Sequence, residues 1–471
     1  MTDPRSPDAR RPGGRRSRPR VRADAARVVA YEVLRAVSEE DAYANLVLPT
    51  RIRAARLDAR DAAFATELVA GSLRRQGTYD AIIAACANRP LERIDVAVRD
   101  VLRLGTHQLL ATRVAPHAAV ATSVDLVRAE VGQSATGFVN AVLRRVGARS
   151  LDAWVRAVAP DPSTDPIGFA AVARSHPRWV VEELQRALGD RADELDDLLA
   201  ADNLPPRVTL VARPGLCEPG ELVASGGEAT AYSPYGVVLA AGDPGSVPAV
   251  AEGRAGVQDE GSQLVAAALA DAGVEGGEST WLDLCAGPGG KAALLGAVAA
   301  GRGAHVVAVE RQPHRADLVA RAVRALPAGA VEVLAADGTV PAWPAGSFDR
   351  VLVDAPCSGL GALRRRPESR WRRSAGDLTS LVPLQVRLLE SALDSVRPGG
   401  VVVYATCSPV LAETEGVVGD VLGRRTDATL AHVTGVLQQV PDAAGPLPGT
   451  VQLWPHRHGT DAMFVALLRR R

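Results

Sequence analysis

The chain has 471 residues, of which 47% are hydrophobic and 23% are charged, and its formal net charge is zero. This length predicts two or three domains with apolar cores, and the balanced charge gives no overall sign of nucleic-acid binding. The sequence has no apolar stretch of about 18 residues that would indicate a membrane span, and no secretory signal is recognisable. The five cysteines show neither CxxC pairs nor a histidine cluster at metal-binding spacing. We therefore expect a reducing cytoplasm, no disulfides and no metal site.

The first 22 residues differ in composition from the rest of the chain. They contain eight arginines and four prolines and show no apolar periodicity. This composition predicts a disordered basic arm, which is either a solvated tail or a segment that contacts phosphates.

Residues 24–146 carry apolar residues at helical spacing throughout. Asp24 is a plausible N-cap for a first helix over residues 26–37. Further helices are expected at Asp58–Leu73, Thr78–Ala87, Val96–Leu110, Ala118–Val131 and Ala135–Val146. The pattern predicts an all-α bundle of five to seven helices. His107 and His117 have no visible carboxylate or metal partner, so we expect them to pack or cap rather than catalyse.

Two basic helix ends, residues 73–76 and 143–146, are either solvated C-termini or contacts with RNA. Four segments of the same region also occur in a characteristic order, namely Asp61 with Glu67–Arg75, Val101–Gly105, His117–Val120 and Gly137–Arg145. In this order they resemble the NusB-like domain found in a group of RNA-modifying enzymes. The resemblance implies RNA binding without catalysis.

Residues 147–169 contain three prolines and are expected to form a linker. Two amphipathic helices should follow, one starting at Pro177 and one over Arg191–Ala201. Beyond them, the alternating segment Arg207–Ala212 predicts a strand, and further short strands are possible at Leu222-Val223 and Val237–Leu239. A small α/β domain is therefore expected before the C-terminal region.

From Gly256 onwards, strands and helices alternate, which predicts βαβ units and a largely parallel sheet. Seven strands are expected, at Thr280–Cys285, His305–Glu310, Val331–Ala336, Asp349–Asp354, Gly400–Thr406, a weak segment near Leu437–Val440, and Met463–Leu468. The last strand follows a long loop region and could run antiparallel.

The segment Trp281–Lys291 reads as a buried strand, a glycine turn and a helix start. Gly287, Gly289 and Gly290 allow the backbone to approach a ligand closely. An ordinary tight connection would show the same glycines, but Lys291 is the only lysine among the 54 lysine and arginine residues. Because the chain uses arginine for nearly every other cation, we expect this position to require the compact amine of lysine, which a guanidinium cannot replace.

A polar group lies at the end of each of the main predicted strands: Asp283, Glu310, Asp337, Asp354 and Cys407. Open α/β sheets bind their ligands at this edge. Any one acid could be a helix cap, but together they predict a cofactor site, with Glu310 placed for ribose hydroxyls and Asp337 for an adenine amino group. The turn lacks the full dinucleotide pattern and looks instead like the S-adenosylmethionine site of a Rossmann-like methyltransferase.

Two cysteines lie in turns at adjacent strand ends, Cys357 in Asp354-Ala-Pro-Cys-Ser-Gly and Cys407 in Tyr404-Ala-Thr-Cys-Ser. A lone cysteine is more often buried and inert. A pair at a cofactor cleft, with an aspartate three residues before one of them, favours an activated thiolate that attacks a pyrimidine ring.

Two more segments complete the pattern, Asp283–Lys291 and Arg364-Arg-Arg-Pro-Glu-Ser-Arg-Trp371. Together with the two cysteine segments, they resemble the RNA cytosine-5 methyltransferases. When the NusB-like region is included, the chain resembles the bacterial 16S ribosomal RNA enzymes of the Sun/Fmu type. The resemblance covers about residues 24–471. It implies that Cys407 attacks carbon 6 of a cytosine, that Asp354 holds the ring edge, that Cys357 assists elimination and that Lys291 contacts the reacting site. The implied S-adenosylmethionine site comprises Asp283, Cys285, Ala286, Gly287, Pro288, Gly289, Gly290, Lys291, Glu310, Arg315, Asp337 and Asp354.

Three positions depart from the pattern of these enzymes: Glu310 replaces a frequent Asp, Leu360 a usual Thr, and Met463 a common aromatic residue. The basic run Arg364–Arg366, with residues 370–373, would lie beside the site and suit phosphates and a splayed base, unless it is a solvated loop. Two rival readings are a DNA-type cytosine methyltransferase with Cys357 as the nucleophile, and an RNA-binding assembly factor whose methyltransferase half is inert.

The expected architecture is α/β: a Rossmann-like methyltransferase domain with a seven-stranded, mostly parallel sheet at residues 256–471. It would be preceded by the arm at 1–22, the NusB-like bundle at 23–150, and a linker with a small α/β domain at 151–255. The expected partner is ribosomal RNA of the 16S type, and the expected state is a monomer.

Overall fold

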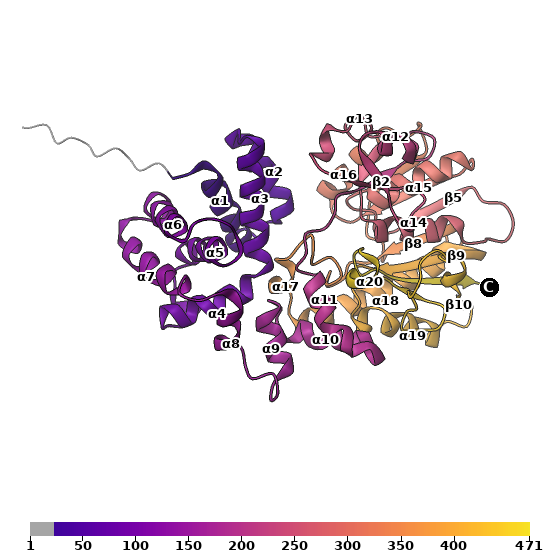
Figure 1. Ribbon diagram of the computed structural model, residues 1–471. Coiled ribbons are helices and arrows are strands. Elements are labelled where there is room, and N and C mark those ends of the chain that lie inside the picture. Colours follow the sequence, from indigo (N-terminus) through magenta and orange to yellow (C-terminus); the bar gives the residue numbers. More distant parts are fainter. Residues whose placement is uncertain (1–22) are drawn as a thin grey trace, which may run out of the picture.

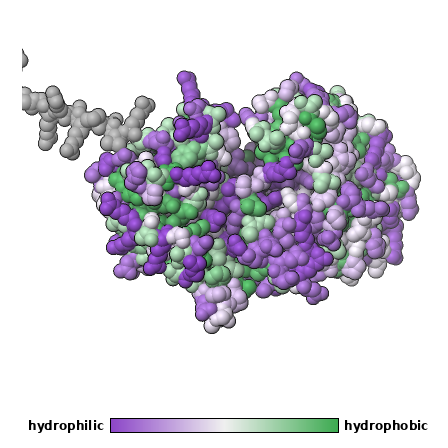
Figure 2. All heavy atoms as spheres, in the orientation of Figure 1, coloured by the Kyte–Doolittle hydropathy of each residue, from purple (hydrophilic) through white to green (hydrophobic). Residues whose placement is uncertain are grey.

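The computed structural model describes residues 23–471, so the predicted basic arm at residues 1–22 lies outside the described part of the chain. Figure 1 shows a lobe of helices beside a lobe built around a large β-sheet, and Figure 2 shows a notch between them on one face. No helix within residues 23–471 is long and apolar enough to cross a membrane.

Seven helices form the bundle of the first lobe: α1 (Ala25–Glu39), α2 (Ala44–Ala55), α3 (Ala59–Arg74), α4 (Gln76–Ala87), α5 (Val96–Ala111), α6 (Pro116–Glu130) and α7 (Thr136–Val146). The side chains of Asp24 and Asp58 accept hydrogen bonds from the first turns of α1 and α3, which fixes where these helices begin. Helix α2 was not predicted, because it contains Pro49 and few buried side chains, so its apolar periodicity is weak.

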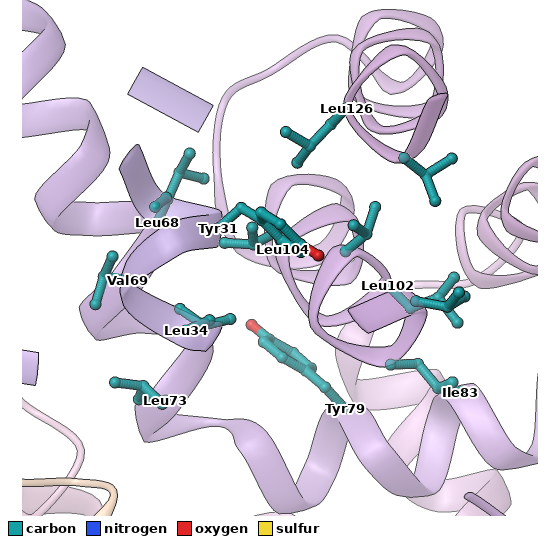
Figure 3. Packing of buried hydrophobic residues seen from close by; sticks show 14 of the residues in the cluster. Tyr31, Leu34, Leu68, Val69, Leu73, Tyr79, Ile83, Leu102, Leu104 and Leu126 are labelled. Atoms are coloured by element: carbon teal, nitrogen blue, oxygen red, sulfur yellow. The ribbon is translucent and has the colours of Figure 1, made fainter. Parts of the chain in front are cut away.

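The bundle core consists of apolar side chains from several helices, as Figure 3 shows around Leu34, Leu68 and Tyr79. His107 packs within this core, where its Nδ1 atom lies 3.0 Å from the hydroxyl of Tyr79. It therefore packs as expected, although the Glu67 carboxylate, a partner not visible in the sequence, lies 3.3 Å from its Nε2 atom. His117 is exposed on α6.

The predicted linker at residues 147–169 is wrong, because much of it is helical. The structure has α8 (Leu151–Val158), α9 (Pro166–Ala173), α10 (Arg178–Leu188) and α11 (Leu195–Ala201). Ser150 caps α8, and Pro166 takes the first position of α9, where a proline sacrifices no helical hydrogen bond. One of the three prolines, Pro166, thus begins a helix in a segment that was read as a linker.

A small antiparallel sheet follows, with strand order β2-β3-β1-β4. Its elements are β1 (Thr209–Ala212), α12 (Pro219–Ala224), β2 (Gly227–Ala229), β3 (Gly236–Leu239), α13 (Pro248–Ala251) and β4 (Ala255–Val257). The strands expected at residues 207–212 and 237–239 are confirmed. The possible strand at Leu222-Val223 is wrong, because Pro219 starts a helix there and Leu222 is buried in the core under the small sheet.

The large sheet has strand order β10-β12-β9-β8-β5-β6-β7, with a short β11 beside β12. Its strands are β5 (Thr280–Asp283), β6 (His305–Glu310), β7 (Val331–Ala335), β8 (Phe348–Asp354), β9 (Val396–Thr406), β10 (Ala428–Ala431), β11 (Val451–Gln452) and β12 (Phe464–Arg470). β5 to β9 run parallel, and β12 runs antiparallel to β9, as expected. The weak strand near residues 437–440 is wrong: Leu437 and Val440 are buried in turns, and β10 forms the edge.

Alternate residues of each central strand face opposite apolar layers. Trp281 and Val403 pack with α14 (Glu260–Asp271) and α15 (Gly290–Gly301), whereas Leu282 and Tyr404 pack with α18 (Leu378–Ser395) and α19 (Glu415–Arg424). A parallel sheet covered by helices on both faces is the doubly wound arrangement. The carboxyl ends of five parallel strands therefore meet at one edge, where every predicted site residue was placed.

Candidate active site

The glycine turn between β5 and α15 lies tightly against the next βα unit. Gly289 has φ +109°, and a side chain there would collide with Val319 and Ala322 of α16 (Pro313–Val323). A Cβ at Gly287 would overlap the Oε2 atom of Glu310. Only glycine fits at position 289, whereas a side chain at position 287 would have to displace the Glu310 carboxylate, and the turn leaves backbone rather than side chains at the sheet edge.

Glu310 and Arg315 hold the turn from the side of β6. The Arg315 guanidinium donates to the carbonyl oxygen of Gly287 at 2.8 Å and lies 3.5 Å from the Glu310 carboxylate. Glu310 is buried and accepts a hydrogen bond from the Gln312 backbone at 2.9 Å, which leaves its Oε2 beside the glycine turn. Arg315 is thus positioned to shape the turn.

Asp337 lies two residues beyond the end of β7. Its Oδ1 accepts from the hydroxyl and the backbone N–H of Thr339, at 2.7 and 2.9 Å. These two hydrogen bonds lower the pKa of Asp337 below its usual value, and the nearby Arg311 acts in the same direction. Asp337 is therefore an ionised acceptor at the third strand end.

Asp283 and Lys291 form the buried centre of the site with Asp354. The Lys291 ammonium donates to Asp354 Oδ2 at 2.7 Å. Asp283 is fully buried and its Oδ2 has no hydrogen-bond partner among the described residues. Burial, together with the charge of Asp354, raises the pKa of Asp283 to about 7, although Lys291 opposes the shift. A buried carboxylate oxygen without a partner fits a ligand that brings a hydrogen-bond donor, such as an amino group.

The two cysteines come together because their strands are parallel neighbours, with Asp354 of β8 in register with Ala405 of β9. The turns that follow bring the Cys357 and Cys407 sulfurs to 3.4 Å from each other, and both residues are partly exposed. The hydrogen bond to Cys407, burial and nearby negative charge raise the pKa of Cys357 well above that of an ordinary thiol.

Lys291 also lies within electrostatic reach of the second cysteine. Burial opposes the charge on its amine, but Asp354 and, more weakly, a charge on Cys407 raise the pKa of Lys291 above its usual value. The Lys291 ammonium therefore interacts electrostatically with both the Asp354 carboxylate and the Cys407 sulfur. The structure brings Asp354, Cys357, Cys407 and Lys291 into one group, as the sequence analysis expected.

Two predicted cofactor residues present backbone but not side chains. The Cys285 side chain packs in the apolar layer below the sheet, and burial raises the pKa of its thiol well above normal. Ala286 is buried against Ala292, Ala308 and Val319. Pro288, in contrast, is exposed in the turn.

Two further polar residues at this edge were missed from the sequence. Gln258 is buried beside the start of α15 at Gly290, and its Oε1 has no hydrogen-bond partner within residues 23–471. Glu413 is buried beneath the two cysteine turns. Gln258 follows the short strand β4, which was not predicted, and Glu413 lies seven residues beyond β9, so the rule used for strand ends did not reach them.

The prediction that the arginine run binds RNA is wrong for Arg370 and Arg372. Arg370, in α17 (Ser369–Arg372), is fully buried and donates to Ser175 O and Asn203 Oδ1, each at 2.9 Å. Arg372 donates to the backbone carbonyls of Asp41 and Ala42, in the loop between α1 and α2. Arg372 therefore ties the helical lobe to the α/β lobe, and Arg370 ties the residues after α9 and α11 to it. Sequence spacing did not distinguish such internal use from a free basic loop.

Comparisons with known proteins agree with this division of the chain. Residues 274–469 match the sequence model of the family described as 16S rRNA methyltransferase RsmB/F, and residues 24–148 match that of the NusB family.

Similar proteins match over nearly the full length. A putative methyltransferase of Mycobacterium tuberculosis is 53% identical over 97% of this chain and 98% of its own. The ribosomal RNA small subunit methyltransferase B of Erwinia tasmaniensis is 32% identical over 94% of this chain and 98% of its own. The crystal structure of a protein named PH0851 superposes with a TM-score of 0.78 at 23% identity, covering 96% of this chain and 99% of that one, which shows a shared fold.

Proposed function

The chain belongs to the RsmB/F family of 16S rRNA methyltransferases, and from this premise we propose that it methylates carbon 5 of a cytosine in ribosomal RNA through a covalent adduct with Cys407. The methyl donor would be S-adenosylmethionine, which supplies an electrophilic methyl group when it is bound. The observation that carries the proposal is the pair of sulfurs 3.4 Å apart beside the Lys291–Asp354 ion pair.

The donor's site would lie along the carboxyl edge of the sheet. Glu310 suits the two ribose hydroxyls, and the ionised Asp337 suits the adenine amino group. The partnerless oxygen of Asp283 suits the ammonium of the methionine end, which the glycine turn would cradle. The support for this assignment is the order of the three acids along β5, β6 and β7.

On the substrate side, the target base must leave its stack to reach the sulfurs. Cys407 as a thiolate would add to carbon 6 of the ring, which makes carbon 5 nucleophilic toward the methyl group. Asp354 would accept a hydrogen bond from the amino edge of the cytosine, and Lys291, which donates to Asp354 Oδ2, would hold this carboxylate in place. Cys357 would then assist removal of the proton from carbon 5, so that Cys407 can leave.

The test uses Cys357→Ala, Cys407→Ala and, as a matched control, Cys217→Ala in the core of the small sheet, each incubated with S-adenosylmethionine and a 16S ribosomal RNA fragment. We expect a denaturation-resistant RNA–protein adduct with Cys357→Ala, none with Cys407→Ala, and normal turnover with Cys217→Ala. An adduct that requires Cys357 instead would favour the DNA-type mechanism. A wild-type protein that transfers no methyl group to RNA would refute the proposed function.

A further inference from the structure

A buried glutamate lies directly beneath the two cysteine turns. Glu413 follows β9 by seven residues and is fully buried. Its carboxylate accepts four hydrogen bonds from three residues: Ser358, Ser408 and Gln385. A buried carboxylate with this many donors is strongly held in place, and it keeps the donors in place in return.

Two of these donors are the immediate neighbours of the cysteines. Ser358, next to Cys357, donates its backbone N–H to Oε1 at 2.7 Å and its hydroxyl to Oε2 at 2.6 Å. The hydroxyl of Ser408, next to Cys407, donates to the same Oε2 at 2.6 Å. Since one oxygen joins both turns, the carboxylate sets how far apart the two sulfurs lie.

The carboxylate is itself anchored from two further elements. Gln385 of α18 donates from Nε2 to Glu413 Oε1 at 3.0 Å and to the Pro356 carbonyl oxygen at 2.9 Å. The hydroxyl of Tyr404 in β9 donates to the backbone carbonyl oxygen of Glu413 at 2.7 Å. The support under the turns is therefore continuous with the core of the lobe.

The charge of Glu413 acts on the sulfur of Cys357. Its carboxylate is one of the groups that raise the pKa of Cys357, after the hydrogen bond to Cys407 and burial. Lys291, in contrast, interacts electrostatically with Cys407. A negative charge beside Cys357 favours a proton on this thiol, which leaves Cys407 as the sulfur of the pair that can act as the nucleophile.

We propose that Glu413 is a positioning residue that fixes the spacing of the two sulfurs and directs the thiolate to Cys407. Its effect on methyl transfer rests on the proposed function. Its effect on the two thiols does not, because their reactivity can be measured without RNA or methyl donor.

The test compares Glu413→Gln, which removes the charge but keeps an acceptor, with Glu413→Ala, which removes both. Glu415→Gln is the matched control, because Glu415 lies two residues away and accepts no hydrogen bond from either cysteine turn. Iodoacetamide modification of each cysteine, followed by mass spectrometry over a range of pH, reports the thiolate at each site. In the wild type, Cys407 should react at lower pH than Cys357. In Glu413→Gln, Cys357 should react ~10-fold faster at the same pH.

Methyl transfer supplies the second readout. We expect kcat to fall about 100-fold in Glu413→Ala and less in Glu413→Gln, with KM for RNA and for the donor within about twofold of wild type. Unchanged Cys357 reactivity and unchanged kcat in the folded Gln variant would overturn the proposal. So would a wild-type protein in which Cys357 reacts at lower pH than Cys407, a result that does not depend on any variant folding. Failure of the wild type to methylate RNA would instead count against the proposed function alone.

Discussion

Lys291 balances the charges of the site. Its ammonium is paired with Asp354, while Asp283, deeper in the site, is held partly protonated near neutral pH. An arginine would need room for a planar guanidinium in a place where the amine is nearly enclosed, which accounts for the single lysine of this arginine-rich chain. The centre can take up a cationic ligand by releasing one proton from Asp283.

The raised pKa of Asp283 predicts that the protein loses stability as the pH rises. The unfolded carboxyl ionises near pH ~4, whereas the folded one keeps its proton until about pH 7, so its stabilising contribution is full below the first value and lost through the second. Asp283→Asn should abolish a decline on the order of 3 kcal/mol in the free energy of unfolding. Urea unfolding of both proteins at several pH values between about 5 and about 8 measures it.

Asp337→Asn is the control for this experiment. The pKa of Asp337 is lowered, so its contribution is present above the unfolded value and is lost only in more acidic solution. It should therefore leave the slope between about pH 5 and about pH 8 unchanged. An equally steep decline in Asp283→Asn and in the wild type would show that another group causes it.

At the scale of elements, the strands that end in polar residues were predictable and the connections were not. β5, β6, β8 and β9 carry continuous apolar runs because both faces are covered, and such runs are recognisable in sequence. Pro166 was read as part of a linker and Leu222-Val223 as a possible strand, although Pro166 and Pro219 each begin a helix there. Leu437 and Val440 are buried without being paired, which apolarity alone does not distinguish from a strand.

The prediction that the arginine run binds RNA failed for a different physical reason. In the sequence, an arginine that donates to backbone carbonyls of a distant lobe cannot be told from an arginine that binds phosphate. Only the fold shows which hydrogen-bond acceptors each arginine meets. Arg366 and Arg372 flank the ring of Tyr43, at 4.9 and 5.1 Å from its centroid, and the backbone N–H of Ala44 donates to Glu368. The segment that follows the Cys357 turn is thereby tied to the start of α2.

This junction predicts that Arg372→Ala loosens the helical lobe without disturbing the donor site. Losing charged hydrogen bonds to carbonyls and a cation–π contact should lower the free energy of unfolding by roughly 2 kcal/mol. It should speed proteolysis in the loop at residues 40–43 and reduce kcat/KM for RNA, with donor affinity unchanged. Arg373→Ala is the control, because Arg373 contacts Asp377 of its own lobe. Equal effects of the two substitutions would contradict the assigned role of Arg372.

At the scale of the whole molecule, the zero net charge conceals a local basic face on the helical lobe. Four exposed arginines gather where α4, α7 and the start of α8 meet: Arg89, Arg144, Arg145 and Arg149. Arg89 and Arg149 lie over the rings of Phe138 and Trp154, and Arg145 donates to the Cys86 carbonyl oxygen. No ion pair in the described part of the chain includes any of the four. The basic helix end at residues 143–146 therefore belongs to a larger unneutralised surface.

We predict that this face contributes phosphate contacts when the full chain binds ribosomal RNA. The variant Arg89→Gln/Arg144→Gln/Arg149→Gln leaves Arg145 and its structural hydrogen bond in place. It should weaken RNA binding and reduce by about 2 the slope of the logarithm of the binding constant against the logarithm of the salt concentration. The reason is that binding releases fewer counterions when three arginine–phosphate contacts are lost. The control variant is Arg191→Gln/Arg321→Gln/Arg324→Gln, which removes three exposed arginines elsewhere. If both triple variants have the wild-type slope, these arginines are solvated helix ends that serve only the helix dipoles.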